Sequence, residues 1–230
     1  MKTNPSTETD ISAKMGDYLV EIYRLCERGK NDNGYVSTSS LAELLDVTAP
    51  AVNRMITRLK ELGLLQHEPY QGIKLTDEGR RSALSKLRVH RIVEAFLANV
   101  MGFDWHEVYD EARRMSSALS EPLIMRMLEM AGNPHECPHG EPIPTRDGTI
   151  PVLDDVRLVD ATPGETYTLI RVMTRESDRL AYLKALGLVP GAPLTLIHIA
   201  PFNGPMQLKL GDEYRIIGHN LAELIRVKGI

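Results

Sequence analysis

The stretch Leu41–Leu62, with the sequence LAELLDVTAPAVNRMITRLKEL, decides how the N-terminal part of the chain folds. The periodicity breaks once, at residues 46–50. There Thr48 can accept a hydrogen bond from the first turn of a new helix, and Pro50 suits that turn because it has no backbone N–H. Two short helices joined by a tight corner are therefore predicted. The apolar residues at helical spacing are Leu41, Leu44, Leu45, Val52, Met55, Ile56, Leu59 and Leu62.

Polar and basic residues occupy the positions of the second helix that the apolar stripe leaves free. Short side chains at a helix start, followed by arginine and lysine, suit a helix whose N-terminal end reads base edges while its flanks hold phosphates. A solvated helix pair is the plain alternative. The predicted DNA-contacting residues are Ser37, Thr38, Thr48, Ala49, Pro50, Ala51, Asn53, Arg54, Thr57, Arg58, Lys60 and Lys74.

The residues that follow favour DNA binding over that alternative. Two apolar segments, 62–65 and 73–76, flank a turn at residues 69–72, which predicts a β-hairpin with Lys74 on its second strand. Two helices and a hairpin in this order make a winged helix-turn-helix. From Arg54 to Arg91 the chain has nine lysines and arginines against four acids, although its net charge is −4. That local excess suits a module that faces phosphates.

The rest of the chain predicts further helices and then a small sheet domain. Residues 1–11 are polar, and 132–151 form a loop rich in proline and glycine that ends in a linker. From residue 152 short β runs are punctuated by glycine and proline, as expected for a small antiparallel barrel with one helix at 177–186. The predicted β runs are 166–173, 193–200, 206–210 and 213–218. Four helices are expected, at 12–27, 80–100, about 104–118 and 120–131. The predicted domains are 1–80, 81–145 and 153–230, with a linker at 146–152.

The chain therefore belongs to a mixed class, mainly α in its N-terminal part and all-β in its C-terminal part. Its 230 residues suffice for two or three small domains. Cys26 and Cys137 are too few for a disulfide framework, and there is no signal peptide or apolar run that could span a bilayer. A reducing cytoplasm is the expected compartment. The long helix at 80–100 is more apolar than a small domain needs, which predicts a twofold dimer through Phe96, Leu97, Leu119 and Leu123.

Two later motifs join the winged helix in one pattern, namely the loop CPHGEPIP at 137–144 and the segment LKALGLVPGAPLTL at 183–196. In this order the chain resembles the diphtheria-toxin-repressor family of metal-dependent transcriptional regulators, in its three-domain form with an SH3-like C-terminal domain. The resemblance implies a homodimer that binds Mn²⁺ or Fe²⁺ and represses metal-uptake genes from a palindromic operator. It implies neither an enzyme nor a small organic substrate.

One metal site of that family is intact. His90 and Glu94 lie four residues apart on the long predicted helix and so share a face, although such a pair is usually just solvated. Cys137 and His139 offer a thiolate and an imidazole, which alone is a weak metal signal. The resemblance implies that Glu94, Cys137 and His139 form a site with His90 nearby. A further carboxylate would come from the sheet domain, where Glu176 and Asp178 are the candidates.

The other site of the family is not intact. Asp17 and His90 match two of its ligands, but the remaining three positions carry Arg113, Ser116 and Ser117, which are poor ligands for Mn²⁺ or Fe²⁺. The site is absent, or Arg113 replaces the metal by pairing with Asp17. The plain alternative is that Arg113 faces solvent. A third, less favoured reading moves the site one turn earlier, to His106, Glu107, Asp110 or Glu111.

An enzyme is the main different class of function. The sequence has no glycine-rich phosphate loop, nucleophile elbow or HExxH motif. Cys137 and His139 offer a nucleophile and a base, but two loop neighbours alone provide no third group to orient the base. A winged-helix regulator that binds DNA without metal, or that senses redox state through Cys137, is the main alternative. A role of the barrel in protein–protein contact is another.

Overall fold

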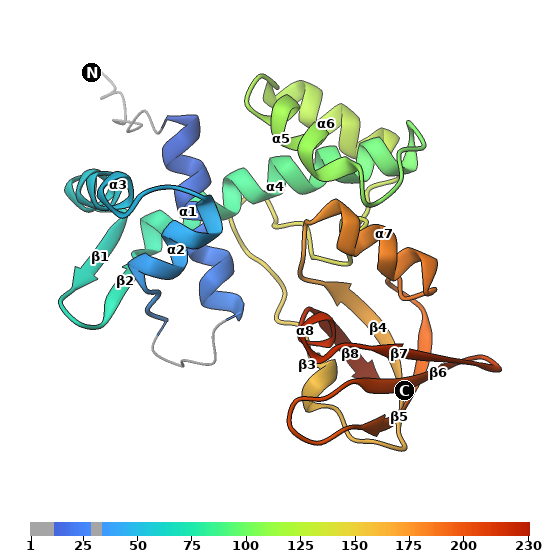
Figure 1. Ribbon diagram of the computed structural model, residues 1–230. Helices are drawn as coiled ribbons and strands as arrows, with labels where there is room; N and C mark the ends of the chain where they lie inside the picture. The colour runs from blue at the N-terminus through green and yellow to red at the C-terminus, as the bar shows by residue number, and fades with distance from the viewer. Residues whose placement is uncertain (1–11, 29–33) are drawn as a thin grey trace, which may run out of the picture. The chain divides into compact units, whose positions relative to one another are not determined.

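The computed structural model describes residues 12–28 and 34–230, which form two compact units (Figure 1). The first unit comprises the chain up to residue 88 together with 144–149, and the second comprises 89–143 and 150–230. The polar residues 1–11 and residues 29–33 lie outside the described residues. Among the described helices, none combines the length and the apolar character needed to cross a membrane. The domain boundaries given above stay predictions.

The first unit contains the predicted helix-turn-helix. Helix α1 spans Ala13–Arg28, α2 spans Thr38–Leu45 and α3 spans Ala49–Glu61. The apolar stripe is the reason for the packing, because Leu41, Val52, Ile56 and Leu59 are all buried. Ser37 caps α2, since its hydroxyl accepts a hydrogen bond from the Ser40 N–H at 3.0 Å. Thr48 precedes α3 and is exposed, but its side chain makes no capping hydrogen bond, which corrects the prediction.

The predicted hairpin follows as β1, Leu65–Glu68, and β2, Gly72–Leu75, paired antiparallel. Val36 bridges to Ile73 of β2, which ties the segment before α2 to the wing. Gly72 has φ of 115°, and a Cβ there would lie 2.3 Å from the Val36 carbonyl oxygen. Only glycine fits this close approach. Helix α4, Asp77–Asn99, then leads from the first unit into the second.

The helical part of the second unit consists of the C-terminal half of α4 with α5, Val108–Ser116, and α6, Glu121–Met130. Helix α5 starts four residues later than predicted. The segment 104–107 forms a turn instead, because the Glu107 N–H donates to the Asp104 carbonyl at 2.9 Å and the Asp104 N–H to the Glu107 carboxylate at 3.1 Å. Trp105 therefore lies in a turn rather than in α5, and its side chain packs with the sheet domain.

The C-terminal part is a six-stranded sheet in the order β3-β8-β4-β5-β6-β7, with every neighbouring pair antiparallel, as predicted. Strands β3 and β8 were not among the predicted β runs. Asp155, just before β3, is nearly inaccessible and binds Arg171 of β4 and Arg226 of β8, each at 2.8 Å. The elements are β3 Val156–Arg157, β4 Thr166–Val172, α7 Ser177–Ala185, β5 Pro193–Ile199, β6 Met206–Leu210, β7 Glu213–Ile217, α8 His219–Ala222 and β8 Ile225–Gly229.

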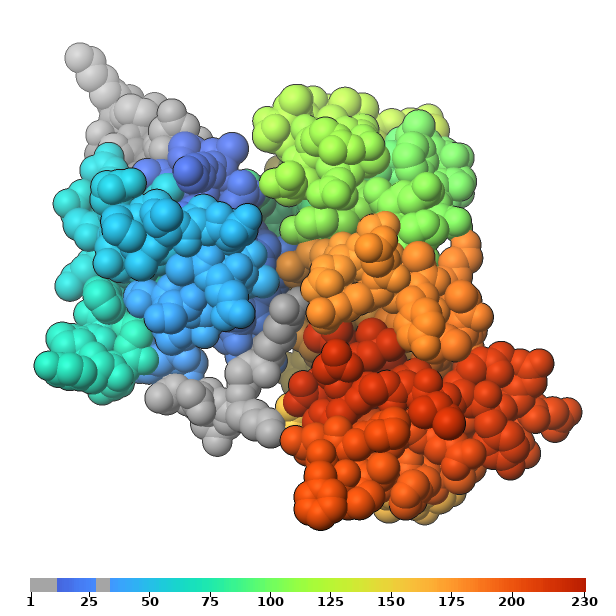
Figure 2. All heavy atoms as spheres, viewed as in Figure 1, coloured from blue at the N-terminus to red at the C-terminus, as the bar shows by residue number. Residues whose placement is uncertain are grey.

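The sheet and the helices of the second unit share apolar contacts. Trp105 is buried in the same cluster as Leu180 of α7 and Leu208 of β6. Figure 2 shows α7, in orange, directly beside the green α5–α6 hairpin, and Lys184 of α7 donates a hydrogen bond to Asp104. The segment between α4 and α5 therefore attaches the sheet domain to the helices.

The predicted dimer residues do not all lie on the surface. Leu97 is only 2% exposed and packs in a core with Val108, Ala112 and Ile124, so its assignment to a subunit interface is wrong. The α5–α6 hairpin of the same chain covers the face of α4 that carries Leu97. Phe96 and Leu119 are half-buried, and Leu123 is exposed. The other exposed apolar side chains of this part are Met125 and Met130 of α6, with Val100 and Met101 just after α4.

We expect Leu97→Ala to lower the free energy of unfolding by about 2–5 kcal/mol, because it removes a fully packed side chain and leaves a cavity. Leu123→Ala serves as the control, and its effect should stay within about 0.5 kcal/mol in the separated subunit. Urea unfolding of both variants, followed by circular dichroism at low protein concentration, measures the difference. Equal losses for the two variants would contradict the assignment of Leu97 to the core.

Candidate metal centre

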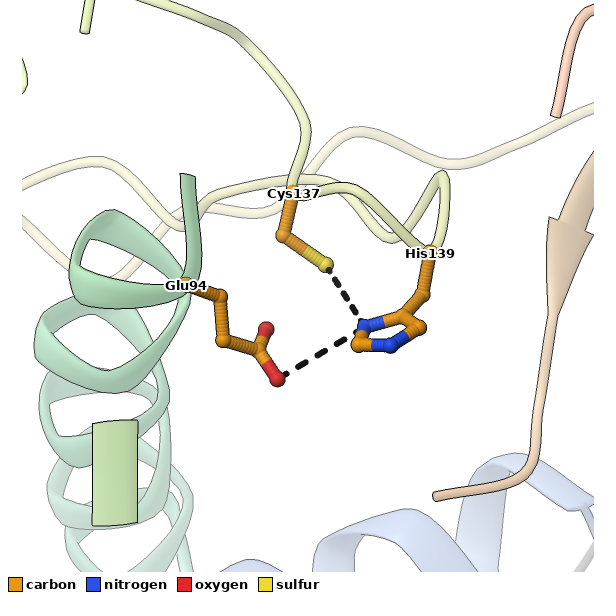
Figure 3. A group of neighbouring side chains, drawn as sticks. All are labelled: Glu94, Cys137 and His139. Atoms are coloured by element: carbon orange, nitrogen blue, oxygen red, sulfur yellow. Dashed lines mark hydrogen bonds and ion pairs between the residues drawn. The ribbon is translucent and has the colours of Figure 1, made fainter. Parts of the chain in front are cut away.

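Three ligand side chains converge within the second unit: Glu94 from α4, and Cys137 and His139 from the loop after α6 (Figure 3). One ligand atom of each lies within 4.8 Å of the others, and all three residues are buried. This is the constellation predicted from the sequence. Among the described residues it is the one group of three or more histidine, cysteine and acidic side chains with this spacing.

The loop has a fixed shape. The Cys137 N–H donates to the Glu141 carbonyl at 2.9 Å, and the Gly140 N–H donates to the Cys137 carbonyl at 2.8 Å. Gly140 has φ of 79°, and a Cβ there would lie 1.9 Å from the Ile170 carbonyl oxygen, so the loop needs glycine at this point. The Val172 N–H of β4 donates to the His139 carbonyl at 2.9 Å. The backbone of the loop that carries Cys137 and His139 therefore packs against β4 of the sheet domain.

Arg91 attaches the same loop to α4. Its side chain is 1% exposed and donates to the Pro142 carbonyl at 2.6 Å and to the carboxylate of Glu141. Arg91 and Glu94 lie three residues apart and so face the same side of α4. This role of Arg91 was not predicted, although an arginine within the apolar pattern of a helix is visible in the sequence.

A backbone carbonyl orients the ring of His139. Its Nε2–H donates to the Trp105 carbonyl at 2.8 Å. Nδ1 therefore faces the other two ligands, lying 3.7 Å from Cys137 Sγ and 3.6 Å from Glu94 Oε1. A hydrogen bond at one imidazole nitrogen that leaves the other for a cation is the usual second contact of a metal-binding histidine. Trp105, the single tryptophan of the chain, was not identified from the sequence.

The electrostatics of the group follow from its burial. Burial opposes ionisation of Glu94, but the positive charges of His90 and His139 outweigh it and hold the pKa of this carboxyl well below its usual range. Burial likewise disfavours a charged His139, yet the Glu94 carboxylate raises the pKa of this imidazole well above its usual value. Burial and the negative charge of Glu94 raise the pKa of the Cys137 thiol. Without a metal the group thus holds two exchangeable protons beside one carboxylate.

His90 lies beside the group rather than within it. Its Nε2 is 3.2 Å from Glu94 Oε1, the same oxygen that faces His139. The His90 ring packs edge-on against the Tyr109 ring, with the ring centres 4.8 Å apart. The Arg175 guanidinium lies over the Tyr109 ring, 5.2 Å from its centre. His90 is therefore placed to orient the Glu94 carboxylate. Its predicted role as a ligand stays a prediction.

The structure does not bring the predicted fourth ligand into the group. Glu176 and Asp178 are exposed at the start of α7, and Glu176 pairs with Arg179 at 2.8 Å. Both remain close in sequence to β4, whose Val172 N–H bonds to the His139 carbonyl, so they stay predicted candidates for a metal-bound state. The described group offers three protein ligands.

The residues predicted for a second site do not offer a suitable donor set. Asp17 pairs with Lys86 at 2.6 Å, and Ser116 donates its hydroxyl to the Ala112 carbonyl. Arg113 is exposed on α5 with Asp110 at 3.9 Å, whereas its predicted pairing with Asp17 joins the two units and stays a prediction. Ser117 is exposed. The alternative residues His106, Glu107, Asp110 and Glu111 form no ligand group in the described chain.

The predicted DNA-contacting residues lie on one helix-turn-helix surface and its wing. Ten of them are exposed, and Thr38 and Ala51 are half-buried. Asn53 and Arg54 lie in the first half of α3, and neither is covered by the core. The Lys74 ammonium is 5.6 Å from the ring centre of Tyr35, which supports its long side chain at the base of the wing.

Comparisons with known proteins agree with this arrangement. Residues 10–73 match the model of the iron dependent repressor N-terminal DNA binding domain, and residues 76–145 match the iron dependent repressor metal binding and dimerisation domain. Residues 156–229 match the FeoA domain. The iron-dependent repressor IdeR of Mycobacterium tuberculosis is 31% identical over 225 residues, which cover 93% of this chain and 96% of that protein. The chain belongs to the iron-dependent repressor family.

Other members of the family extend the likeness. The diphtheria toxin repressor of Corynebacterium efficiens is 27% identical over 231 residues, covering 93% of this chain and 94% of that repressor. A solved manganese-dependent transcriptional repressor in complex with manganese superposes with a TM-score of 0.86 and 32% identity, over 94% of this chain and 100% of that one. The IdeR structure of T. acidophilum has a TM-score of 0.80 and 26% identity, with full coverage of both chains. The predicted family and fold class are confirmed.

We expect the affinity of this iron-dependent repressor family member for Mn²⁺ to fall on acidification. The raised pKa values of His139 and Cys137 mean that both keep a proton near neutral pH, and each must release it to bind a metal. Glu94 stays ionised because its pKa is lowered, so it contributes no proton. The logarithm of the affinity should rise by about two per pH unit below the raised pKa of His139 and by about one above it.

Competition with a fluorescent chelator between about pH 6 and about pH 8 measures this slope. Cys137→Ser should reduce the slope by about one, because one proton fewer is displaced. His135→Ala, which changes an exposed histidine of the same loop, should leave it unchanged. An affinity that does not depend on pH would contradict the assigned protonation states.

Proposed function

We propose that this protein is a transcriptional repressor that responds to Mn²⁺ or Fe²⁺ and acts as a homodimer on a palindromic operator of metal-uptake genes. The observation that carries the proposal is the buried convergence of Glu94, Cys137 and His139 in a chain that also has an exposed helix-turn-helix. A carboxylate, an imidazole and a thiolate together suit a divalent transition metal of intermediate softness.

When bound, the metal supplies a divalent charge that neutralises Glu94 and takes the place of the protons on His139 and Cys137. The contacts of the ligand residues show which elements a bound metal would connect. Glu94 belongs to α4, while His139 is fixed by Trp105 and by Val172 of β4. Binding therefore joins α4, the CPHG loop and the sheet, and α4 continues into the DNA-binding unit. A shift toward the DNA-competent state is limited by the metal's preference for that state.

The surface of α3 supports the DNA-binding part of the proposal. Asn53 and Arg54 are positioned to reach base edges, since they are exposed near the N-terminal end of the second helix of the motif. Arg58, Lys60 and Lys74 are exposed around them and suit phosphates. These assignments were made from the sequence and remain proposals.

A dimer gives the two recognition helices a fixed spacing on a palindrome. Leu123, Met125 and Met130 are exposed apolar side chains of α6, and Val100 and Met101 are exposed just after the end of α4. These residues replace Leu97 as the proposed contacts. The match to a dimerisation domain over 76–145 supports the same surface.

The geometry of the group supports a metal site over the alternatives. In a catalytic triad the thiol and the carboxylate face opposite nitrogens of the histidine. Here Cys137 and Glu94 both face Nδ1 of His139, while Nε2 is bonded to a backbone carbonyl. Cys137 is 4% exposed and the pKa of its thiol is raised by burial, so it is also a poor redox sensor. The proposal therefore includes no enzymatic activity.

Histidine substitutions in the CPHG loop test the metal dependence. His139→Ala should weaken Mn²⁺ binding by a factor on the order of 100 and remove the metal-dependent gain in operator affinity, because it deletes a ligand. The matched control is His135→Ala, which removes an exposed histidine of the same loop. Fluorescence anisotropy with labelled operator DNA, with Mn²⁺ and with chelator, measures both effects. Metal-dependent DNA binding that survives His139→Ala, Cys137→Ser and Glu94→Gln would place the ligands elsewhere.

Substitutions on α3 and the wing separate base reading from phosphate contact. Arg54→Ala should reduce the preference for operator over random DNA by about 1–3 kcal/mol, since a base contact is lost. Lys60→Ala and Lys74→Ala should weaken binding to both DNAs equally and lower the salt slope by about one each. Titrations at several salt concentrations distinguish the two patterns. An equal loss on both DNAs for Arg54→Ala would show that the helix is oriented differently.

A further inference from the structure

The acidic residue of α1 that the family resemblance offers to a metal already has a cation. The Lys86 ammonium of α4 lies 2.6 Å from Asp17 Oδ1. It also donates to the Ala13 carbonyl at 2.6 Å, within the first turn of α1. Asp17 and Ala13 lie four residues apart on one face of that helix. One ammonium group therefore binds two acceptors of α1 from a neighbouring helix of the same unit.

A glycine in α1 makes room for the lysine. Gly16 is buried within the helix, where glycine is unfavourable relative to alanine. A Cβ at this position would lie 2.8 Å from Lys86 Cδ and 3.2 Å from its Nζ. The stem of the lysine thus passes across α1 at the one residue without a side chain. This second observation shows that α1 is shaped to receive Lys86.

The remaining residues predicted for this site do not compensate for the occupied carboxylate. Arg113 adds positive charge, and Ser116 and Ser117 offer only hydroxyl groups, one of which is used within α5. An ammonium at hydrogen-bond distance from a carboxylate competes directly with a divalent cation for it. The donor set does not fit a second metal.

We propose that Lys86 is a built-in cation that binds Asp17 in place of a metal and positions α1 on α4. The protein then binds one divalent metal per subunit, at Glu94, Cys137 and His139. The docking of α1, which packs beside the helix-turn-helix, does not depend on metal. This inference rests on the proposed function for its DNA readout and on geometry alone for the contact itself.

The stoichiometry of metal binding is the first test. We expect equilibrium dialysis with Mn²⁺, followed by elemental analysis, to give one Mn²⁺ per subunit in the wild type and the same value in Asp17→Asn. His139→Ala should lose that metal. A second Mn²⁺ in the wild type that disappears in Asp17→Asn overturns the proposal, because Lys86 would then have moved aside for a metal.

A double-mutant cycle of Asp17→Asn and Lys86→Met tests the contact. Methionine keeps the stem of the lysine and removes its charge. Each single variant should lower the unfolding temperature in chelator, and the double variant should lower it no further than the single ones, since both changes remove one interaction. Gly16→Ala should cost less in a Lys86→Ala background, which removes the stem that a Cβ at residue 16 would meet, than in the wild type. Additive effects throughout overturn the proposal.

Operator binding gives a readout that distinguishes positioning from phosphate contact. Lys86→Met should weaken operator binding by a similar factor with Mn²⁺ and with chelator, roughly two- to fivefold for a partly exposed ion pair. The salt slope should not change, because Asp17 neutralises the ammonium. Arg81→Met, which removes an exposed charge paired with Glu78 on the same helix, is the control and should change operator affinity less. A salt slope lowered by about one in Lys86→Met would mean that Lys86 binds phosphate, which overturns the positioning role.

The two levels of the proposal fail separately. If the wild type binds neither Mn²⁺ nor operator DNA, the proposed function is wrong, while the thermal cycle still decides whether Lys86 and Asp17 are coupled. If the wild type behaves as a metal-dependent repressor and the cycle is additive, the function stands and the role of Lys86 falls.

Discussion

The carboxylate of Glu94 sets the central constraint on the second unit. It is 3% exposed, and an ionised carboxylate at such a position is stable only beside positive charge. Two imidazoles, those of His90 and His139, face the same oxygen of Glu94. A group built in this way exchanges protons for a metal ion without leaving the carboxylate uncompensated. The site therefore has a charge-balanced form both with and without metal.

Helix α4 connects the Glu94 site to the other elements of the chain. Arg91 and Glu94 project from one face of α4 to the CPHG loop, where Arg91 bonds to Glu141 and Pro142 and Glu94 is a proposed ligand. The loop in turn bonds to β4 through His139 and to the α4–α5 turn through Trp105. Earlier in the same helix, Lys86 bonds to α1 of the DNA-binding unit. One helix thus carries the candidate metal site in its C-terminal half and the Lys86–Asp17 contact near its middle.

The sequence by itself determined the parts whose physics is local. Helical periodicity and Pro50 located the helix-turn-helix, because amphipathic spacing and proline chemistry act within a few residues. Alternating β runs predicted a sheet domain. The motif at 137–144 with Glu94 predicted, through family resemblance, the group of side chains that the structure brings together. Exposure of Asn53 and Arg54 on α3 followed from the same periodicity. Strands β3 and β8 were not predicted because they contain only two and five residues. Among polar neighbours, such short segments show little of the alternating apolar pattern that indicates a strand.

Tertiary structure alone decided which partner each charged or apolar side chain meets. Leu97 looked like an interface residue because periodicity gives a helix its apolar face but not the element that covers it; the α5–α6 hairpin of the same chain covers it. Asp17 looked like a ligand, but Lys86, sixty-nine positions away, reaches it across the glycine at Gly16. Arg91 and Trp105 acquire their roles only when the loop folds back onto α4. Such contacts join residues distant in sequence, and their distances depend on the packing of whole elements.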